Sequence, residues 1–202
     1  MSYPVPAAPL QNEQVIQKSR FITHIARATN KAEARLYIQH IKQQYPDARH
    51  HCWAYIAGHP TATTDIGFSD DGEPSGTAGK PILNVLQHRG VGEIVLVVVR
   101  YFGGIKLGAG GLVRAYSSSA SLAMDKLETE LLVPSKTFTL SFDYTLESKI
   151  KHVLENMRIH IQKSEYTGKI TYTFDVPATD IQMLDDKLIQ MSAGVLRLSR
   201  PD

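Results

Sequence analysis

The residues best suited to chemistry lie in two glycine-rich segments, of which the second runs from Gly103 to Gly111 and follows the apolar run Ile94 to Val99. Glycines let the backbone approach a ligand closely, and the free N–H groups of a helix N-terminus suit an anion. Arg100, Lys106 and Arg114 bracket this segment, where they could pair with phosphate or carboxylate. The pattern predicts an anion-binding surface. The alternative is that the glycines serve only a tight turn and close packing of a helix on a sheet.

Neither glycine-rich segment fits a nucleotide-binding fingerprint. Gly108 and Gly110 supply the first two positions of G-x-G-x-x-G, but Val113 stands where the third glycine or alanine belongs. The stretch Gly76 to Lys80 is similar to a P-loop, yet prolines replace its first glycine and the Ser or Thr that would hold magnesium. We therefore expect neither a dinucleotide site nor a Walker site.

Three acids, Asp70, Asp71 and Glu73, lie within the first glycine-rich segment, Phe68 to Gly79. Carboxylate oxygens are ligands for a hard cation if the fold brings them together. A solvated acidic turn, with Gly72 in the left-handed region, explains the same residues without a ligand, and we favour it. A third interpretation pairs these acids with nearby cations at a shared edge of a sheet: Arg49, Lys80 or Arg100.

The run His50, His51, Cys52 offers metal or thiol chemistry, but its geometry argues against both. On a strand only His50 and Cys52 share a face, and two ligands do not close a zinc site. A Cys/His dyad would also lack a third, orienting group. We favour a packing role for these residues and expect no metal ion, no cofactor and no catalytic residue.

The composition is that of an ordinary globular protein, with 43% hydrophobic and 21% charged residues. Lys and Arg number 22 against 20 Asp and Glu, and this net charge of +2 excludes a protein that is basic over its whole surface but allows a local basic patch. The single cysteine excludes a disulfide and fits a reducing compartment. The sequence contains no secretory signal and no apolar run of membrane-spanning length, so we expect a cytoplasmic protein without membrane contact.

A mixed α/β domain in the first 132 residues must position the glycine-rich segments, which hold most of the 12 glycines found between Gly58 and Gly111. The patterns predict a strand pair in Gln14 to Ala28, a helix capped by Asn30 that ends at Tyr45, a strand from His50 to Ala57, a helix from Pro81 to His88, a central strand from Glu93 to Phe102, and a helix from Leu112 to Leu127.

The remaining residues predict a second domain of ferredoxin-like order, β-α-β-β-α-β, after a linker at Leu131 to Ser135. Its expected elements are a strand at Thr137 to Asp143, a helix at Leu146 to Met157, strands at Arg158 to Tyr166 and Lys169 to Val176, a helix at Ile181 to Met191, and a closing strand at Val195 to Ser199.

Three stretches carry a specific resemblance: ARHHCWAY at 48–55, GFSDDGEPSGTAGKP at 67–81 and VGEIVLVVVRYFGGIKLGAGGLVRAY at 91–116. They closely resemble the IMPACT family in its bacterial YigZ-type branch, over nearly the whole chain. The resemblance implies an α+β protein of two domains. The first, residues 1–132, would be an α/β sandwich with the fold of elongation-factor G domain IV, a small-ribosomal-subunit protein domain and the GHMP kinases. The second, residues 133–202, would be ferredoxin-like, similar to elongation-factor G domains III and V.

The resemblance also implies a translation-linked regulatory or RNA-associated role, without established catalytic residues. The family motifs mark a functional surface made of Arg49, His50, His51, Asp70, Asp71, Glu73, Thr77, Lys80, Arg100, Tyr101, Gly103, Gly104, Gly108, Gly110 and Gly111. Lys106 and Arg114 join it because they flank the second glycine-rich segment.

Three hypotheses follow. The leading one is a non-enzymatic protein that binds RNA, the ribosome or a translation-associated partner through this surface, with Trp53, Tyr55 and Tyr101 as stacking groups beside cations that include Lys18 and Arg20. The second is a metal-assisted hydrolase of a small phosphate ester or nucleotide that uses the three acids. The third is a pure protein-interaction module.

Overall fold

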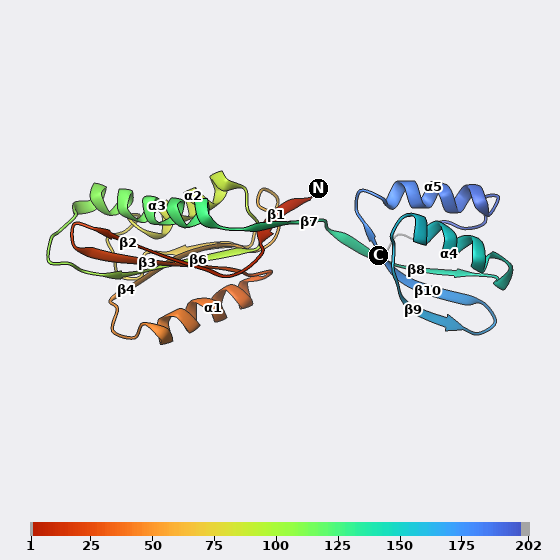
Figure 1. Cartoon of the computed structure of the whole chain (residues 1–202), viewed down its shortest axis with the longest axis horizontal. Helices are drawn as coiled ribbons and strands as arrows, with labels where there is room; N and C mark the ends of the chain where they lie inside the picture. The colour runs from red at the N-terminus through yellow and green to blue at the C-terminus, as the bar shows by residue number, and fades with distance from the viewer. Residues whose placement is uncertain (1, 199–202) are drawn as a thin grey trace. The chain divides into compact units, whose positions relative to one another are not determined.

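The computed structural model describes residues 2–198 and divides the chain into two compact units. The first unit is Tyr3–Leu132, and the second begins at Val133. Each unit packs helices on an antiparallel sheet, so the predicted α+β class with two domains is confirmed (Figure 1). None of the described helices is long and apolar enough to cross a membrane.

The sheet of the first unit has five antiparallel strands in the order β2-β3-β6-β4-β5. Their bounds are β2 Leu10–Ile16, β3 Ser19–Arg27, β4 His50–Ile56, β5 Ile66–Ser69 and β6 Ile94–Tyr101. The central strand β6 is buried from Ile94 to Arg100 because helices cover both faces of the sheet. This double cover explains why its apolar residues form a continuous run rather than alternating with polar ones.

Helix α1 (Lys31–Gln44) lies on one face of this sheet, and α2 (Gly79–Arg89) and α3 (Gly108–Lys126) lie on the other (Figure 1). The predicted alternation on β4 is confirmed: Cys52 packs in the core under α2 and α3, whereas Trp53 and Tyr55 pack in the core under α1. Tyr55 is 3% exposed and Trp53 stacks on it, with ring centroids 5.8 Å apart. The expectation that Tyr55 is a free stacking group is therefore wrong.

The start of α1 follows from its capping residues. The Asn30 side chain accepts a hydrogen bond of 3.0 Å from the Glu33 N–H, while the Glu33 carboxylate accepts one of 2.8 Å from the Thr29 N–H. This reciprocal arrangement satisfies backbone donors that have no partner inside the helix. The predicted helix and its cap are confirmed.

Three short strands of the first unit were not expected. Strands β1 (Tyr3–Pro6) and β7 (Thr129–Leu132) pair antiparallel with each other, and β5 borders the main sheet. Four residues are too few to establish a period of two, and β1 finds its partner at the far end of the unit. Because β7 ends at Leu132 and the next strand begins at Ser135, the expected linker Leu131 to Ser135 is mostly strand.

Helix α3 begins at Gly108, four residues before the predicted start. The glycines Gly108, Gly110 and Gly111 therefore form its first turn instead of a loop. Sequence patterns favour a later start because glycine has a low helix propensity.

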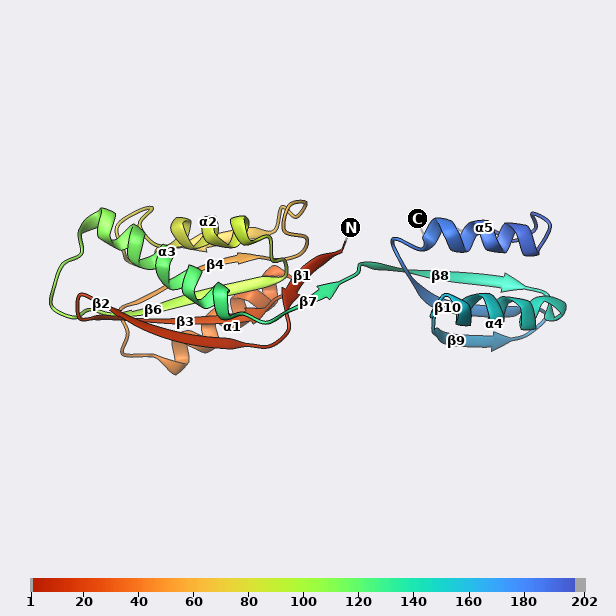
Figure 2. The same cartoon turned by 45° about the horizontal axis from the view of Figure 1, so that its top comes forward.

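The second unit contains β8 (Ser135–Phe142), a 3-10 turn (Tyr144–Leu146), α4 (Glu147–Asn156), β9 (Ile161–Tyr166), β10 (Ile170–Pro177) and α5 (Ile181–Met191). The sheet order is β8-β10-β9, with both pairs antiparallel. Both helices lie on the same face of this sheet (Figure 2). Its core includes Phe138 and Phe174 from the sheet, Leu154 from α4 and Leu188 from α5.

The closing strand expected at Val195 to Ser199 is absent over residues 195–198, and Ser199 lies outside the described residues. The Ser192 hydroxyl accepts a hydrogen bond from the Leu196 N–H, and the Asp185 carboxylate accepts one from the Leu198 N–H. Two backbone N–H groups that would donate to a neighbouring strand therefore donate to side chains instead. Leu196 still packs into the core of the unit.

Candidate functional site

The two glycine-rich segments meet at the end of the central strand. Glu73, from the loop between β5 and α2, accepts hydrogen bonds from Arg100 Nη1 at 2.6 Å and from the Tyr116 hydroxyl at 2.8 Å. Arg100 lies on β6 and Tyr116 on α3. Of the interpretations offered for the acids, pairing with Arg100 is confirmed for Glu73.

This ion pair is buried, with the Arg100 side chain 7% exposed and the Glu73 side chain 4% exposed. The guanidinium carbon of Arg100 lies 5.5 Å from the ring centroid of Phe21 and 5.7 Å from that of Phe102. Arg100 Nε is buried and has no hydrogen-bond partner within residues 2–198. The guanidinium is thus fixed by one carboxylate and two rings while part of its donor capacity is unused.

The carboxylate of Asp70 fills the N-terminus of α2. It accepts backbone hydrogen bonds of 2.8 Å from Gly76, 2.9 Å from Ala78 and 2.8 Å from Gly79. Burial by itself would raise the pKa of Asp70, but these three donors hold it below its ordinary value. The N-terminus of α2 therefore already binds an anion of the same chain, the Asp70 carboxylate.

Asp71 points in another direction. One of its oxygens accepts from Lys42 Nζ at 2.7 Å and the other from the His51 backbone N–H at 2.8 Å. Burial opposes ionisation, but these donors hold the pKa of Asp71 below its ordinary value. The interpretation of Asp70, Asp71 and Glu73 as one cation site is wrong, because each carboxylate has its own partners, and the described residues contain no group of three or more His, Cys, Asp or Glu arranged to hold a metal ion.

Cys52 and His51 are packed inside the first unit, as expected. Cys52 is fully buried, with Sγ 2.9 Å from the Asp70 carbonyl oxygen and 3.3 Å from the Tyr116 hydroxyl. Burial raises the pKa of its thiol far above the usual range, so the nucleophilic thiolate does not form at neutral pH. Burial likewise lowers the pKa of His51, whose Nε2 lies 3.1 Å from the Tyr45 carbonyl oxygen.

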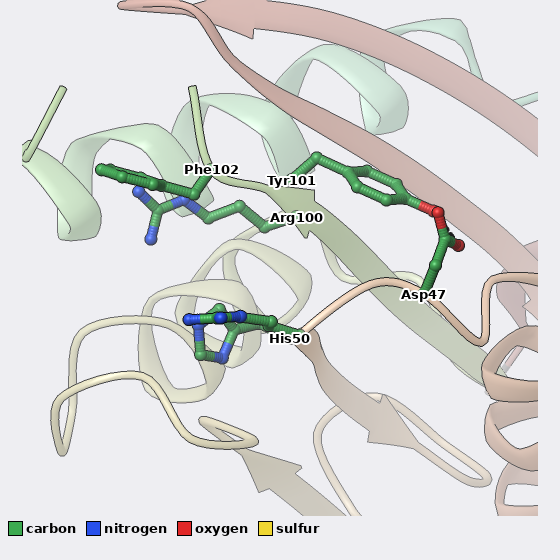
Figure 3. Close-up of a pocket in the computed structure, with 6 residues that line it drawn as sticks. Asp47, His50, Arg100, Tyr101 and Phe102 are labelled. Atoms are coloured by element: carbon green, nitrogen blue, oxygen red, sulfur yellow. Dashed lines mark hydrogen bonds between the residues drawn. The ribbon is translucent and has the colours of Figure 1, made fainter. Parts of the chain in front are cut away.

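An open pocket of about 420 Å³ lies beside the ion pair, and we call it the Arg100 pocket. It is lined by Asp47, Arg49, His50, Arg100, Tyr101 and Phe102. Figure 3 shows the guanidinium of Arg100 next to the Phe102 ring, with His50 across the pocket from them. Asp47 lies at the other end, where it accepts a hydrogen bond of 2.7 Å from the Tyr101 hydroxyl. The pocket therefore has a cationic end and an acidic end.

A second hollow, of about 300 Å³, shares Arg100 and Phe102 with the first and reaches the N-terminus of α3, where Lys106 and Gly108 line it. Helix α3 has no side-chain cap and no acid in its first turn. An anion at this helix end would therefore meet backbone dipoles of favourable sign, and Glu73, the acid that lines this hollow, is already bound to Arg100 and Tyr116.

Several cations around the two loops lack an acidic partner. Five exposed cations have no carboxylate of the described residues within 4.0 Å of their charged groups. They are Lys18, Arg49, Lys80, Lys106 and Arg114. Arg20, which the sequence grouped with them, pairs instead with Glu13 at 2.9 Å. Lys80 Nζ lies over the ring of Phe68, 5.8 Å from its centroid.

The remaining predicted residues have structural roles. The Thr77 hydroxyl is tied to the Pro74 carbonyl oxygen at 2.6 Å, and Gly103 packs so closely on the Lys18–Ser19 turn that a Cβ there would lie 2.0 Å from the Lys18 carbonyl carbon. Gly104 has a φ of +87°, which L side chains rarely adopt. Sequence reasoning missed Asp47 and Phe102. The signal that could have indicated Phe102 is an aromatic residue directly after the central strand.

Comparisons with known proteins cover both units. The family model of the Impact N-terminal domain matches residues 17–124, and that of a domain of unknown function, DUF1949, matches residues 140–195. An IMPACT family member of Haemophilus influenzae is 42% identical over 194 residues, which are 96% of this chain and 94% of the relative. The IMPACT family member YigZ of Escherichia coli is also 42% identical, over 98% of this chain and 97% of its own.

Among solved structures, the crystal structure of a hypothetical protein covers all of this chain and 98% of its own, with 41% identity and a TM-score of 0.75. The two-domain translational regulator Yih1 is matched with 21% identity and a TM-score of 0.34, over 61% of this chain and 46% of its own. That likeness is too distant to carry an argument.

Proposed function

The chain belongs to the IMPACT family, and from this premise we propose that it is a translation-linked regulatory protein that binds RNA through the first unit. The binding surface is the glycine-loop face, defined as loop 102–107, the first turn of α3 and the Arg100 pocket. Under this proposal the protein is not an enzyme and acts in the cytoplasm, where translation takes place.

One observation carries the proposal: five exposed cations without an acidic partner among the described residues, Lys18, Arg49, Lys80, Lys106 and Arg114, lie around the two loops. Away from the loops, Arg27 and Arg89 pair with carboxylates, and the exposed α1 cations Lys31 and Arg35 are two further cations without such a partner. Pairing neutralises a cation, whereas an unpaired exposed cation can release counterions from a phosphate backbone and gain affinity. A net charge of +2 is compatible with this role because the unpaired charges are local.

RNA is favoured over a protein partner by the aromatic group within this charge. Phe102 is 56% exposed and lies against the Arg100 guanidinium. Proteins that bind single-stranded nucleic acid combine a cationic surface with aromatic rings on which bases stack. The hydrolase alternative has lost its basis because Asp70, Asp71 and Glu73 are engaged in separate internal contacts.

Fluorescence anisotropy with a labelled single-stranded RNA across a salt series tests the proposal. We expect the logarithm of the association constant to fall linearly with the logarithm of salt, with a slope of about −0.7 for each cation engaged. The variant Lys106→Glu with Arg114→Glu should lose at least about tenfold in affinity. Its matched control is Lys31→Glu with Arg35→Glu, two exposed cations on α1 without a carboxylate within 4.0 Å, on the opposite face of the sheet.

The outcomes separate the hypotheses. Absence of RNA binding at low salt, or equal losses in both double variants, would overturn the proposal. Co-sedimentation with ribosomes should be weakened by the same Lys106 and Arg114 changes. A partner that stays bound after nuclease treatment, with no RNA affinity in the purified protein, would instead favour a protein-interaction module.

A further inference from the structure

We infer that the Arg100 pocket holds one nucleotide unit of a single-stranded RNA, with its phosphoryl group at Arg49 and Arg100 and its base on Phe102. The inference rests on the proposed RNA binding and adds which residues contact the ligand and how. The volume of about 420 Å³ lies within the range of about 300 to 1,000 Å³ typical of small-ligand sites.

Arg100 is prepared to bind an oxyanion. Its guanidinium carries five N–H donors in a rigid fork, and Glu73 engages Nη1. Glu73 is itself held by the Tyr116 hydroxyl, so the fork is fixed before a ligand arrives. The buried Nε lacks an acceptor among residues 2–198, although buried donors are nearly always paired. Arg100 lines the pocket, so a phosphoryl group there would supply acceptors to the guanidinium N–H groups that reach the pocket and that Glu73 does not engage, at little ordering cost.

The other charges of the pocket are arranged to admit a phosphoryl group at one end. Arg49 is exposed and has no carboxylate of the described residues within 4.0 Å, so its charge is available. The carboxylate of Asp47 is bound to the Tyr101 hydroxyl at the end away from the Arg100 guanidinium (Figure 3). The phosphoryl group is therefore repelled by Asp47 and attracted by Arg49, while Arg100, whose charge Glu73 compensates, contributes N–H donors.

Phe102 supplies the stacking surface. The Arg100 guanidinium lies over its ring, yet the side chain is 56% exposed. An exposed ring that is held in place by a neighbouring guanidinium is a preformed platform for a base. Phosphoryl group and base would then lie at two neighbouring subsites, joined through the ribose of one nucleotide.

His50 favours ribose over deoxyribose. Its Nδ1 lies 3.0 Å from the carbonyl oxygen of Asp71, and because a carbonyl only accepts, Nδ1 carries the hydrogen. In the neutral imidazole, Nε2 is then an acceptor. A 2′-hydroxyl can donate to it, whereas deoxyribose has no such donor.

The test compares binding of a single-stranded RNA hexamer and the DNA hexamer of the same base sequence, by fluorescence anisotropy with full-length protein. Phe102→Leu and Arg49→Gln should each weaken RNA binding by about tenfold. Two matched controls lie outside the pocket: Phe68→Leu, an exposed ring beneath Lys80, and Arg35→Gln, an exposed cation on α1. Each should change affinity by less than about twofold.

His50→Phe should bring the ratio of RNA affinity to DNA affinity close to one, because the acceptor for the 2′-hydroxyl is lost. Photo-crosslinking of a 4-thiouridine hexamer should label the peptide that contains Tyr101 and Phe102. If wild-type protein binds RNA but Phe102→Leu and Arg49→Gln behave like their controls, the pocket assignment is wrong and the proposed function stands. If wild-type protein binds no RNA at low salt, the proposed function itself fails.

Discussion

The two glycine-rich loops are similar in composition. They differ in whether a side chain accepts hydrogen bonds at the N-terminus of the following helix. At the N-terminus of α2, the Asp70 carboxylate accepts three backbone hydrogen bonds. At the N-terminus of α3, no side chain caps the helix and no acid lies in the first turn. The first loop therefore supplies an anion, the Asp70 carboxylate, to the N-terminus of α2, whereas the second loop supplies none to the N-terminus of α3. Glycine enrichment alone therefore does not distinguish a folding device from a binding site.

The difference extends to the surrounding charges. Lys42 and Arg100 each pair with an acid of the first loop, Asp71 and Glu73 respectively. Lys106, beside the second loop, has no carboxylate within 4.0 Å in the described part of the chain. If this comparison is right, changes in the first loop reduce stability and changes around the second loop reduce binding.

The largest effect should come from Glu73, the acid that joins the two loops. Glu73→Ala would leave the Arg100 charge buried without compensation, at a cost of about 3–5 kcal/mol of unfolding free energy. Trp53, the only tryptophan, lies in the first unit, so its fluorescence during urea unfolding reports this loss. The double variant Glu73→Leu with Arg100→Met should regain much of the stability, and a cost below about 1 kcal/mol for Glu73→Ala would contradict a structural role for the first loop.

A pair of glycine substitutions comes next. A Cβ at Gly79 would lie 2.6 Å from backbone atoms of Ser69, which cannot move aside, so Gly79→Ala should cost about 3 kcal/mol. At Gly110 only the end of the Arg114 side chain lies within 4 Å of a Cβ. Gly110→Ala should therefore cost no stability, and the higher helix propensity of alanine should stabilise α3 by up to about 1 kcal/mol. Equal costs in urea unfolding would remove the contrast between the loops.

Asp70→Ala should cost about 2 kcal/mol, because three backbone donors at the start of α2 lose their acceptor. RNA affinity at low salt should stay within about twofold of wild type, since the carboxylate is directed into the loop rather than toward a ligand. A rise in affinity of tenfold or more would mean that the α2 N-terminus also competes for phosphate.

The smallest effect concerns acid. The pKa of Asp70 is lower in the folded protein than in the unfolded chain, so its ionisation stabilises the fold above about pH 4, and this contribution is lost as the pH falls through the folded-state value. Asp70→Asn should therefore lose less unfolding free energy than wild type between pH 5 and pH 3. Parallel pH profiles in urea unfolding would show that the three N–H groups do not depend on the charge.

Where the sequence predicted the fold well, long periodic segments carried the signal. The helix that begins after Asn30, the alternating strand from His50 and the continuous apolar strand β6 are all as expected. The pairing of β1 with β7 depends on contacts between residues far apart in the chain, which local periodicity does not contain. The closing strand failed for a local reason, since Ser192 and Asp185 take backbone donors that a strand would use.

The site was less predictable than the fold. The sequence placed Asp70, Asp71 and Glu73 in one cluster, but their side chains diverge because backbone geometry between neighbours decides where each carboxylate points. One interpretation of the sequence did pair these acids with Arg100 if the two loops met, and Glu73 forms that pair. The sequence also suggested Tyr55 as a stacking group, but this side chain is buried under α1.

The strand β1 has a consequence for synthesis of the protein. Its four residues leave the ribosome well before their partner β7, which follows more than a hundred residues later, roughly 10 s at ordinary translation rates. Throughout that interval β1 is an edge without a partner, the kind of segment that pairs wrongly with other chains. Pro4 and Pro6 lie within it, and because proline has no N–H, half of the strand cannot donate to a foreign sheet. The first strand is thus protected from aggregation until its unit is complete.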